Sequence, residues 1–475
     1  MSTSKNQATQ STFYFHDYET FGISPARDRP AQFAGVRTDA DFNLIGDPLV
    51  IYCKPPADYL PSPEACLITG ITPQKAMKDG LCEADFIAQI HAEFAKPDTC
   101  ILGYNSIRFD DEVTRYTLYR NFYDPYAYAW QNGNSRWDIL DMLRACYALR
   151  PEGIEWAFDE EGKPSFRLEK LTEANGISHA NAHDALSDVL ATIAMTKKVK
   201  EAQPKLFDYL FALRNKNKVK ALLDLVTMKP LVHVSGMFSP WQGCVSWVSP
   251  LAWHPHNQNA VIMVDLTRDP TPLIELSSAE IRERLYTRKD ELGELAPIPV
   301  KLVHINKCPV LAPAATLTPE RADTLGIDRE QCRRSLDLLR AHPQVREKLV
   351  EVFNQEFEGN NDNDPDTQLY AGFFGQGDKA SMDMVRATSP ELLGEREFAF
   401  SDKRLPELLF RYRARNWPQT LSEPELKRWR QHCSDYFESQ LPDYLPRLEA
   451  LAEQNQGNER NFIILKSLYH YLENL

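Results

Sequence analysis

The chain has 475 residues, of which 43% are hydrophobic and 25% charged, and its formal net charge is −13. This length accommodates roughly two to four globular domains, and the acidic balance excludes a protein that coats nucleic acid through bulk positive charge, while allowing an enzyme with a local basic groove. The nine cysteines form no Cys-x-x-Cys pair, no Gly-x-x-x-x-Gly-Lys-Ser/Thr loop occurs, and no stretch suits a membrane span or a signal peptide, so we expect reduced thiols, no ATP-driven motor and a cytoplasmic protein.

Residues 13–20 are predicted to form an aromatic-rich β-strand. Since side chains two apart on a strand share a face, Asp17 and Glu19 continue the face that begins with Phe13 and Phe15. Neighbouring acids in a partly buried place repel each other, and a bound divalent cation would supply the missing positive charge. The alternative is an exposed strand end with solvated charges, which a bare Asp-x-Glu cannot distinguish from a site.

The segments that follow alternate between strand-like and helix-like patterns, which indicates an α/β domain. We expect strands at 34–38 and 49–53 that form a meander with the first, a helix at 85–94, a strand at 100–105 and a helix that begins within 106–112. Asp110 and Asp111 fall in the first turn of this last helix, where acids are also favoured by the helix dipole. Alone, these two residues would be interpreted as helix capping.

A longer helix is predicted over residues 184–200. Its apolar stripe is predicted to consist of Leu186, Val189, Leu190 and Ile193. Asp184 and Asp188 would lie on the opposite side. His183 stands at the helix entrance, where its ring could reach an attacking water, although a lone histidine there is more often a cap or a surface residue.

Residues 104–150 contain eleven aromatic residues and six interleaved arginines. Bases stack on aromatic rings and arginines hold phosphates, so this composition suits a channel for single-stranded nucleic acid. The alternative is a core helix pair with ordinary surface arginines, and we expect only a minority of these aromatic residues to touch a ligand.

Composition also predicts the domain borders. We expect a disordered lead-in over 1–12, the α/β domain over 13–201, a small β-rich domain with helices over 202–355, a hydrophilic linker over 356–367 and a helical domain over 368–475.

Three sequence patterns occur in the order of a known set of motifs. These are Asp17-x-Glu19, Asn105-x-x-x-Phe109-Asp110 and His183-x-x-x-x-Asp188. They resemble the three motifs of the DEDD exonucleases, in the subclass with histidine in the third motif. Segments along the whole chain, such as 146–153, 228–238 and 304–311, resemble one family within this group more closely, the bacterial exonuclease I family of single-strand-specific 3′→5′ deoxyribonucleases.

The resemblance implies a ribonuclease-H-like α/β exonuclease domain, an SH3-like β-barrel and a C-terminal helical domain that closes over DNA with the barrel. It also implies that 5′-mononucleotides are released from the 3′ end of single-stranded DNA, in DNA repair and recombination, by two-metal-ion hydrolysis. The implied metal ligands are Asp17, Glu19, Asp110 and Asp188. Such an all-oxygen set suits two Mg²⁺ ions, with Mn²⁺ as a substitute.

The other implied roles concern the proton and the substrate. His183 would be the general base, which suits a histidine because its ordinary pKa is about 6.5. Glu19 would also touch the terminal sugar, and Arg167 would grip a phosphate. Four rival acids match no motif position and rank lower: Asp111, Asp138, Asp141 and Asp184.

Two sets of interaction residues are predicted as well. The candidates for the DNA groove are Arg115, Tyr126, Trp130, Arg144 and Lys301. The family resemblance also implies recruitment by single-stranded DNA-binding protein through its acidic C-terminal tail, for which Lys229 and Arg340 are candidates. We expect a monomer.

Three other functions remain open from the sequence. Sister families with the same motifs trim RNA, a catalytically silent adaptor could keep the fold, and a proofreading or repair subunit would act through a polymerase partner. The five motif residues argue against the adaptor, and three domains in one chain without an obvious partner tail argue against the subunit.

Overall fold

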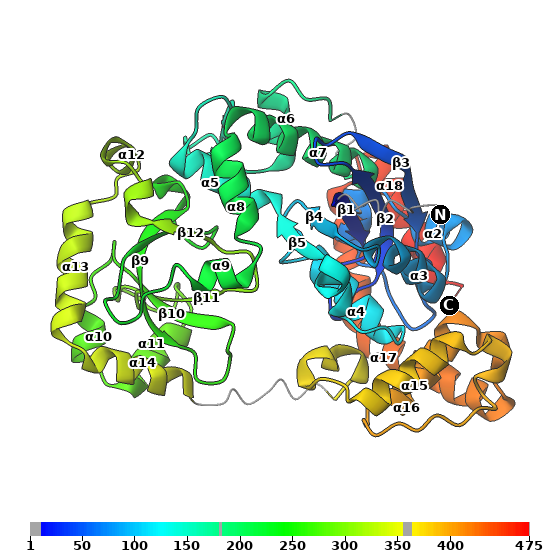
Figure 1. Cartoon of the computed structure of the whole chain (residues 1–475). Helices are drawn as coiled ribbons and strands as arrows, with labels where there is room; N and C mark the ends of the chain where they lie inside the picture. Colours follow the sequence, from blue (N-terminus) through cyan, green and yellow to red (C-terminus); the bar gives the residue numbers. More distant parts are fainter. Residues whose placement is uncertain (1–10, 180–182, 355–362, 475) are drawn as a thin grey trace, which may run out of the picture. The chain divides into compact units, whose positions relative to one another are not determined.

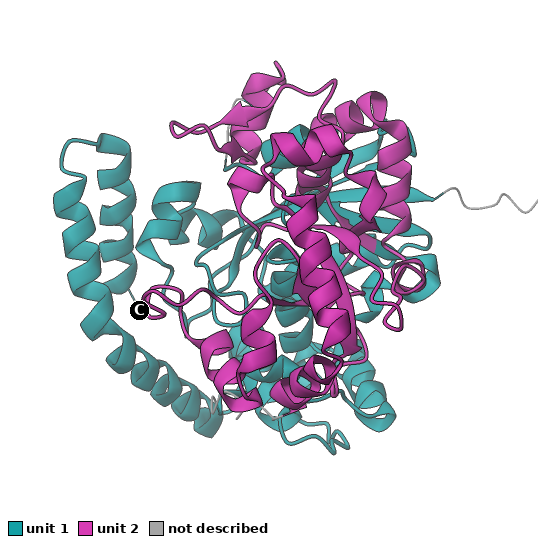
Figure 2. Ribbon diagram, turned by 90° about the vertical axis from the view of Figure 1, so that its left-hand side faces the viewer, with its two compact units in different colours: residues 1–135, 179–193, 362–475 teal, residues 136–178, 194–361 magenta. Residues whose placement is uncertain are grey.

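A computed structural model describes residues 11–179, 183–354 and 363–474. The chain divides into two compact units (Figure 2), and unit 1 consists of residues 1–135, 179–193 and 362–475, whereas unit 2 consists of residues 136–178 and 194–361. Each unit is therefore assembled from stretches that are separated in sequence. Within the described ranges, no helix is both long and apolar enough to cross a membrane.

Unit 1 begins with the predicted meander. Its first half contains β1 (Thr12–Thr20), β2 (Pro30–Thr38), β3 (Leu44–Tyr52), α1 (Pro63–Thr69), α2 (Pro73–Asp79), α3 (Glu83–Phe94), β4 (Thr99–Gly103), α4 (Asp110–Arg120), η1 (Ala127–Ala129) and η2 (Gln131–Gly133). In the sheet, β1 pairs antiparallel with β2, β2 pairs antiparallel with β3, and β1 pairs parallel with β4. Figure 1 shows β1 between β2 and β4, so the predicted meander is confirmed.

The two faces of β1 have different surroundings. Tyr14 and Tyr18 belong to an apolar cluster with Phe86 and Ile90 of α3 and with Val113 of α4. Residues at odd positions point to the other face of the sheet because strand side chains alternate. This places the carboxyl groups that end β1 away from the cluster with α3 and α4.

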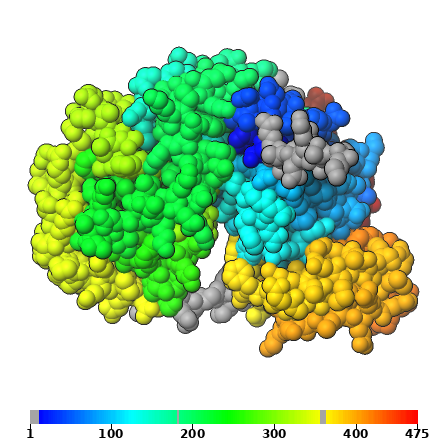
Figure 3. All heavy atoms as spheres, viewed as in Figure 1, coloured from blue at the N-terminus to red at the C-terminus, as the bar shows by residue number. Residues whose placement is uncertain are grey.

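The second half of unit 1 is helical, as predicted. It contains η5 (Pro365–Ala371), α15 (Gln376–Ala387), η6 (Pro390–Leu392), α16 (Leu405–Asn416), η7 (Pro418–Thr420), α17 (Glu423–Gln454) and α18 (Glu459–Leu472). Tyr119 and Phe122 from the α4 region pack with Met382, Val385 and Leu405 in one apolar cluster. Figure 3 shows the yellow and orange surface of these helices directly against the cyan surface of the α4 region.

A second apolar cluster joins the last helices to the start of the chain. Tyr59 and Cys66 from the α1 region pack with Leu448 of α17 and with Leu465 and Leu468 of α18. The helical C-terminal part is therefore not an independent body, because it completes the core of unit 1.

Buried ion pairs reinforce this junction. Asp366 is 3% exposed, and its carboxylate accepts hydrogen bonds from Arg29, Arg411 and Arg415. Arg415 also donates to the buried carboxylate of Asp58 at 3.1 Å. Buried carboxylates need such partners, because an unpaired buried charge is costly.

This network differs from the prediction of a hydrophilic linker over 356–367. Residues 355–362 lie outside the described part of the chain, but Asp364 and Asp366 are anchored by arginines and η5 begins at Pro365. The acidic composition that suggested solvated chain instead supplies partners for buried arginines. The predicted lead-in over 1–12 also falls mostly outside the described residues, and Thr12 already belongs to β1.

Two elements span the border between the units, namely β5 (Ser135–Asp138) and α7 (Ala185–Ala202). The predicted helix at 184–200 is thus confirmed, but its apolar stripe is wrong at one position. Leu190 is 42% exposed, whereas Ala191 and Met195 are buried beside Val189. The buried surface of α7 thus includes both small and large residues and extends to the side that carries Ala191 and Met195.

Unit 2 contains the β-rich part. Its elements are α5 (Ile139–Leu149), β6 (Ala157–Phe158), β7 (Pro164–Ser165), α6 (Leu168–Ala174), α8 (Pro204–Ala212), α9 (Lys216–Lys220), β8 (Leu231–Val234), η3 (Pro240–Gln242), β9 (Val245–Trp253), β10 (Ala260–Asp265), α10 (Thr271–Glu275), α11 (Ser278–Tyr286), β11 (Val300–His304), β12 (Val310–Pro313), η4 (Ala314–Thr316), α12 (Pro319–Thr324), α13 (Arg329–Ala341) and α14 (Gln344–Asn354). The strands form an antiparallel sheet in the order β11-β10-β9-β8-β12. None of the nine cysteines, all of which lie in the described ranges, is in a disulfide, and seven of them are buried, which agrees with the prediction of reduced thiols.

Candidate functional site

The carboxyl groups of Asp17 and Glu19 stand at the end of β1. The chain packs closely against itself just after them. A Cβ at Gly22 would lie 2.2 Å from the carboxyl carbon of Asp28, so glycine avoids a clash at this position. Gly103, at the end of the neighbouring β4, allows a similarly close approach, since a Cβ there would lie 2.6 Å from the backbone oxygen of His16. Gly22 therefore allows the close packing of the turn after β1, and Gly103 allows the end of β4 to approach the backbone of β1.

Asp110 joins these two acids from the start of α4. It is 4% exposed, and its Oδ1 accepts a hydrogen bond of 3.1 Å from the backbone N–H of Tyr18. The loop between β4 and α4 makes this possible through a left-handed residue, Asn105, with a φ of 62°. Asp110 is therefore directed toward β1, and this contact gives it a role beyond helix capping.

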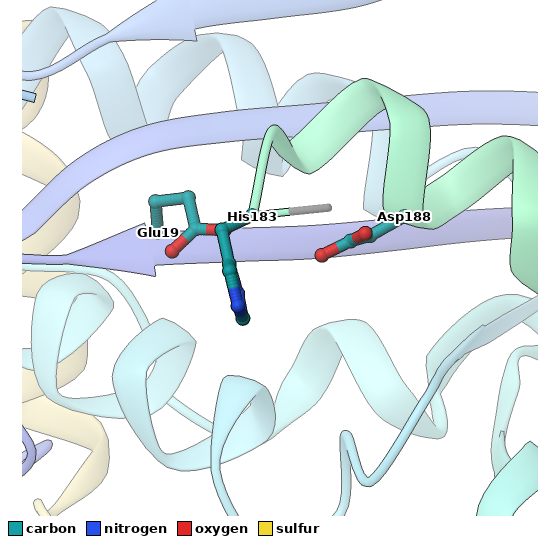
Figure 4. Close-up of side chains that lie close together, drawn as sticks. All are labelled: Glu19, His183 and Asp188. Atoms are coloured by element: carbon teal, nitrogen blue, oxygen red, sulfur yellow. The ribbon is translucent and has the colours of Figure 1, made fainter. Parts of the chain in front are cut away.

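The start of α7 supplies the remaining polar groups. His183 has a φ of 67° and is exposed, and Asp188 follows in the first turn of the helix. Glu19, His183 and Asp188 each offer one possible ligand atom, and these atoms all lie within 4.8 Å of one another. Figure 4 shows the three side chains gathered between the strand that carries Glu19 and the start of the helix that carries Asp188.

The charges in this group oppose one another. Burial raises the pKa of Asp17 well above its usual range, and the neighbouring carboxylates, that of Asp110 first among them, raise it further. Burial, together with the charges of Asp188 and Asp110, raises the pKa of Glu19 to about 8. Such an arrangement favours a ligand that brings positive charge.

A second histidine contacts the site and escaped the sequence analysis. The Nε2 atom of His179 lies 2.5 Å from Oδ1 of Asp188. Burial raises the pKa of Asp188, and the hydrogen bond with His179 opposes that rise. The only signal in the sequence was the spacing of four residues between His179 and His183, in a segment without a regular pattern.

The four rival acids have other contacts. Asp184 accepts a hydrogen bond from the backbone N–H of Ser187 and therefore caps α7. Asp138 caps α5 in the same way, and Asp141 pairs with Arg144 at 2.8 Å. The fourth, Asp111, is buried; its charge acts on His16, whose pKa burial lowers to about 4.

Three of the predicted DNA-groove residues lie in unit 1. Trp130 is 64% exposed, whereas Arg115 is buried. Arg115 pairs with Glu112 at 2.9 Å, and its guanidinium carbon lies 5.4 Å from the centre of the Tyr126 ring. Trp130 is thus the most available stacking surface of the three.

The other predicted substrate residues lie in unit 2. Arg167 is at the N-cap of α6, and its largely exposed side chain pairs with Glu169 at 2.8 Å. Arg144 lies over the ring of Phe166, and the ammonium group of Lys301 on β11 donates to the hydroxyl of Ser235 at 3.1 Å. Their DNA contacts stay predictions.

The two candidate partner residues also lie in unit 2. Lys229 is exposed, and Arg340 on α13 donates to the backbone oxygen of Thr227 at 2.8 Å. Arg340 lines a cavity of about 430 Å³ whose other walls are Val226, Thr227, Met228, Leu251, Leu339, His342, Pro343 and Arg346. This cavity therefore combines basic and apolar walls.

Comparisons with known proteins agree along the whole chain. The family models for an exonuclease, for the exonuclease I SH3-like domain and for the exonuclease I C-terminal domain match residues 14–196, 214–355 and 363–475. Exodeoxyribonuclease I of Escherichia coli (strain K12) is 59% identical over 467 residues, which cover 98% of each chain. Exodeoxyribonuclease I of Haemophilus influenzae is 54% identical, over 97% of this chain and 98% of the relative.

Solved structures give the same result. The crystal structure of E. coli exonuclease I in complex with a dA16 oligonucleotide superposes with a TM-score of 0.97 at 59% identity, over 98% of this chain and all of the relative. The zinc-bound form of the E. coli complex with single-stranded DNA has a TM-score of 0.95 at 59% identity, over 98% of this chain and 99% of that one. A structure of SSB/exonuclease I with the inhibitor CFAM has a TM-score of 0.92 at 57% identity, over 98% of this chain and 100% of that one.

These matches confirm the predicted fold class, with an exonuclease domain, an SH3-like domain and a helical C-terminal domain in that order. They also favour a nuclease over a catalytically silent adaptor, because the three family models describe an exonuclease and its domains and both curated relatives are exodeoxyribonucleases. The chain belongs to the exonuclease I family of nucleases.

Proposed function

We propose that this protein removes 5′-mononucleotides from the 3′ end of single-stranded DNA by two-metal-ion hydrolysis, in DNA repair and recombination. The observation that carries the proposal is the meeting of carboxyl groups from β1, α4 and α7 with one histidine at a single place. Relatives of 59% identity have been solved with single-stranded oligonucleotides, which supports this substrate class.

The residues present fit a pair of divalent cations. The donors are carboxylate oxygens, which suit Mg²⁺ or Mn²⁺, and burial with mutual repulsion raises the pKa of both acids on β1. The zinc-bound relative supports divalent ions as a class without choosing the metal. The residues that would hold the ions are Asp17, Glu19, Asp110 and Asp188.

When bound, two such ions would supply activation of the attacking water and stabilisation of the leaving 3′ oxygen. The protein itself contributes by holding the carboxylates in place. The carboxylate of Asp110 is held by the backbone N–H of Tyr18, and Asp188 projects from the first turn of α7.

His183 is the proposed general base. Its side chain is exposed, and its ring lies close to Glu19 and Asp188, so it can accept a proton from a water that approaches the same group of atoms. Its left-handed backbone turns the chain just before α7. We expect His183→Ala to lower kcat by about 10²–10⁴-fold, the usual range for a general base.

Contacts with the substrate would extend beyond the proposed metal ligands and His183. We propose that Glu19 also contacts the terminal sugar and that Arg167 grips a phosphate. The further DNA contacts are Arg115, Tyr126, Trp130, Arg144 and Lys301. Among these residues, Trp130 is the strongest candidate for stacking on a base, because its ring is exposed.

We also propose that the cavity beside Arg340 receives the acidic C-terminal tail of single-stranded DNA-binding protein, with Lys229 as a further contact. An acidic peptide that ends in apolar side chains would match basic and apolar walls in one cavity. A solved relative that contains SSB supports this partner.

The test is digestion of single-stranded DNA labelled at the 3′ or at the 5′ end, beside duplex DNA and RNA, with magnesium and with EDTA. We expect immediate release of the 3′ label from single-stranded DNA alone, and its loss with EDTA or in Asp188→Ala. Preferential cutting of RNA would place the protein with the RNA-trimming families instead, and binding without cutting would refute catalysis.

A further inference from the structure

A histidine with a largely buried side chain contacts the carboxylate of Asp188, one of the proposed metal ligands. His179 lies in the segment between α6 and α7, and its side chain is only 5% exposed. Its Nε2 atom is 2.5 Å from Oδ1 of Asp188. An ionised carboxylate can only accept a hydrogen bond, so opposite an ionised Asp188 the Nε2–H group of His179 is the donor.

This hydrogen bond restricts how Asp188 can turn. A carboxylate on the first turn of a helix can rotate about its side-chain bonds, and each rotamer presents its oxygens differently. The contact between His179 and Oδ1 holds the carboxylate of Asp188 in one orientation. In this orientation one carboxylate oxygen lies within 4.8 Å of a possible ligand atom of Glu19 and of His183. Hydrogen bonds of this kind orient metal ligands and raise metal affinity.

The two histidines differ in their surroundings. His183 is exposed and free to meet a substrate, whereas the ring of His179 is enclosed and directed at a protein carboxylate. Enclosure suits a fixed donor better than a group that must exchange protons with an incoming water.

We propose that His179 is a positioning residue that fixes the carboxylate of Asp188 for a divalent cation. The inference rests on the proposed function, because it takes Asp188 to be a metal ligand. It predicts that His179 acts through metal affinity, while His183 acts through the proton.

The experiment measures Mn²⁺ binding to the full-length protein without DNA, by calorimetry and by electron paramagnetic resonance of free Mn²⁺. The variants are His179→Ala and His179→Gln, in which the amide can replace the Nε2 donor. Ser178→Ala, at the exposed neighbouring position, is the matched control. Asp188→Asn tests the ligand itself.

We expect Mn²⁺ affinity to fall by about 10–100-fold in His179→Ala, to recover in large part in His179→Gln and to be unchanged in Ser178→Ala. In His179→Ala, nuclease activity should recover when the Mn²⁺ concentration is raised. If His179→Ala is too unstable to purify, His179→Leu takes its place with the same expected loss of affinity, and His179→Gln should keep an affinity within a few-fold of wild type.

Two results separate the possible failures. Unchanged Mn²⁺ affinity in His179→Ala, with binding lost in Asp188→Asn, would overturn the role of His179 alone. Unchanged binding in Asp188→Asn would overturn the proposed ligand set. Loss of kcat in His179→Ala at saturating Mn²⁺ with normal affinity would show that His179 acts in the chemical step and not through metal affinity, and would also refute the inference.

Discussion

Replacing Glu19 by glutamine should stabilise the protein in the absence of metal. The pKa of Glu19 is raised from 4.5 to about 8 in the folded protein, by burial and then by Asp188 and Asp110. A raised carboxyl pKa means that the folded state binds the proton more tightly than the unfolded state. The contribution of this proton to the free energy of unfolding is therefore fully present below pH 4.5 and is lost as the pH rises toward 8.

The size of the effect follows from this difference. At about 1.36 kcal/mol per pH unit, Glu19 stays mostly protonated in the folded protein at both pH values, while its ionisation favours the unfolded state by about 3 kcal/mol at pH 7 and about 1 kcal/mol at pH 5. Glu19→Gln removes this effect. At about 1 °C per kcal/mol for a chain of 475 residues, the melting temperature should rise by about 3 °C at pH 7 and about 1 °C at pH 5.

The assay is thermal unfolding in EDTA at both pH values, with Glu397→Gln as the control because Glu397 is exposed in unit 1. Adding magnesium should stabilise the wild-type protein more than Glu19→Gln, so the gain should shrink. A melting temperature for Glu19→Gln at or below wild type in EDTA at pH 7, or an equal gain at pH 5 and pH 7, would refute the reasoning.

Three further changes test other parts of the molecule. Trp130→Ala should weaken binding of single-stranded DNA by about 1–3 kcal/mol and leave hydrolysis of a saturating short oligonucleotide mostly intact; equal loss of both would make Trp130 structural. Asp58→Asn should lower the free energy of unfolding by about 3 kcal/mol at pH 7, because it leaves part of the buried charge of Arg415 without its partner, and a loss below about 1 kcal/mol in chemical unfolding would contradict this. The double reversal of Lys229 and Arg340 to glutamate should abolish binding of an acidic tail peptide in a pull-down while activity on free DNA is retained, and unchanged capture would exclude these residues.

The five motif residues could be found from the sequence because local rules and motif order agree on them. The period of two along β1 puts Asp17 and Glu19 on one face, and the helix starts at Asp110 and near His183 are marked by polar residues after apolar segments. The distances between these groups could not be predicted, since they depend on how β1, α4 and α7 pack.

Other features depended on contacts that no local pattern reveals. Asp366 meets Arg29 across 337 positions in the sequence, so its acidic surroundings could only suggest a solvated linker. His179 lies outside any helix or strand, and its role depends on a hydrogen bond with Asp188. The helical spacing predicted that Leu190 is buried, but packing exposes it and buries Ala191 and Met195 instead.

The shared core of unit 1 has a consequence for the order in which the molecule can fold. The hydroxyl of Tyr444 donates to the backbone oxygen of Pro61 at 2.9 Å, across 383 positions of the chain, and Leu468 of α18 lies in the same apolar cluster as Tyr59. During synthesis, the catalytic half must therefore wait for α17 and α18 before its core can close. A nascent chain that already carries all five motif residues still lacks the helices that complete their supporting structure, so full nuclease activity should arise only near the end of translation.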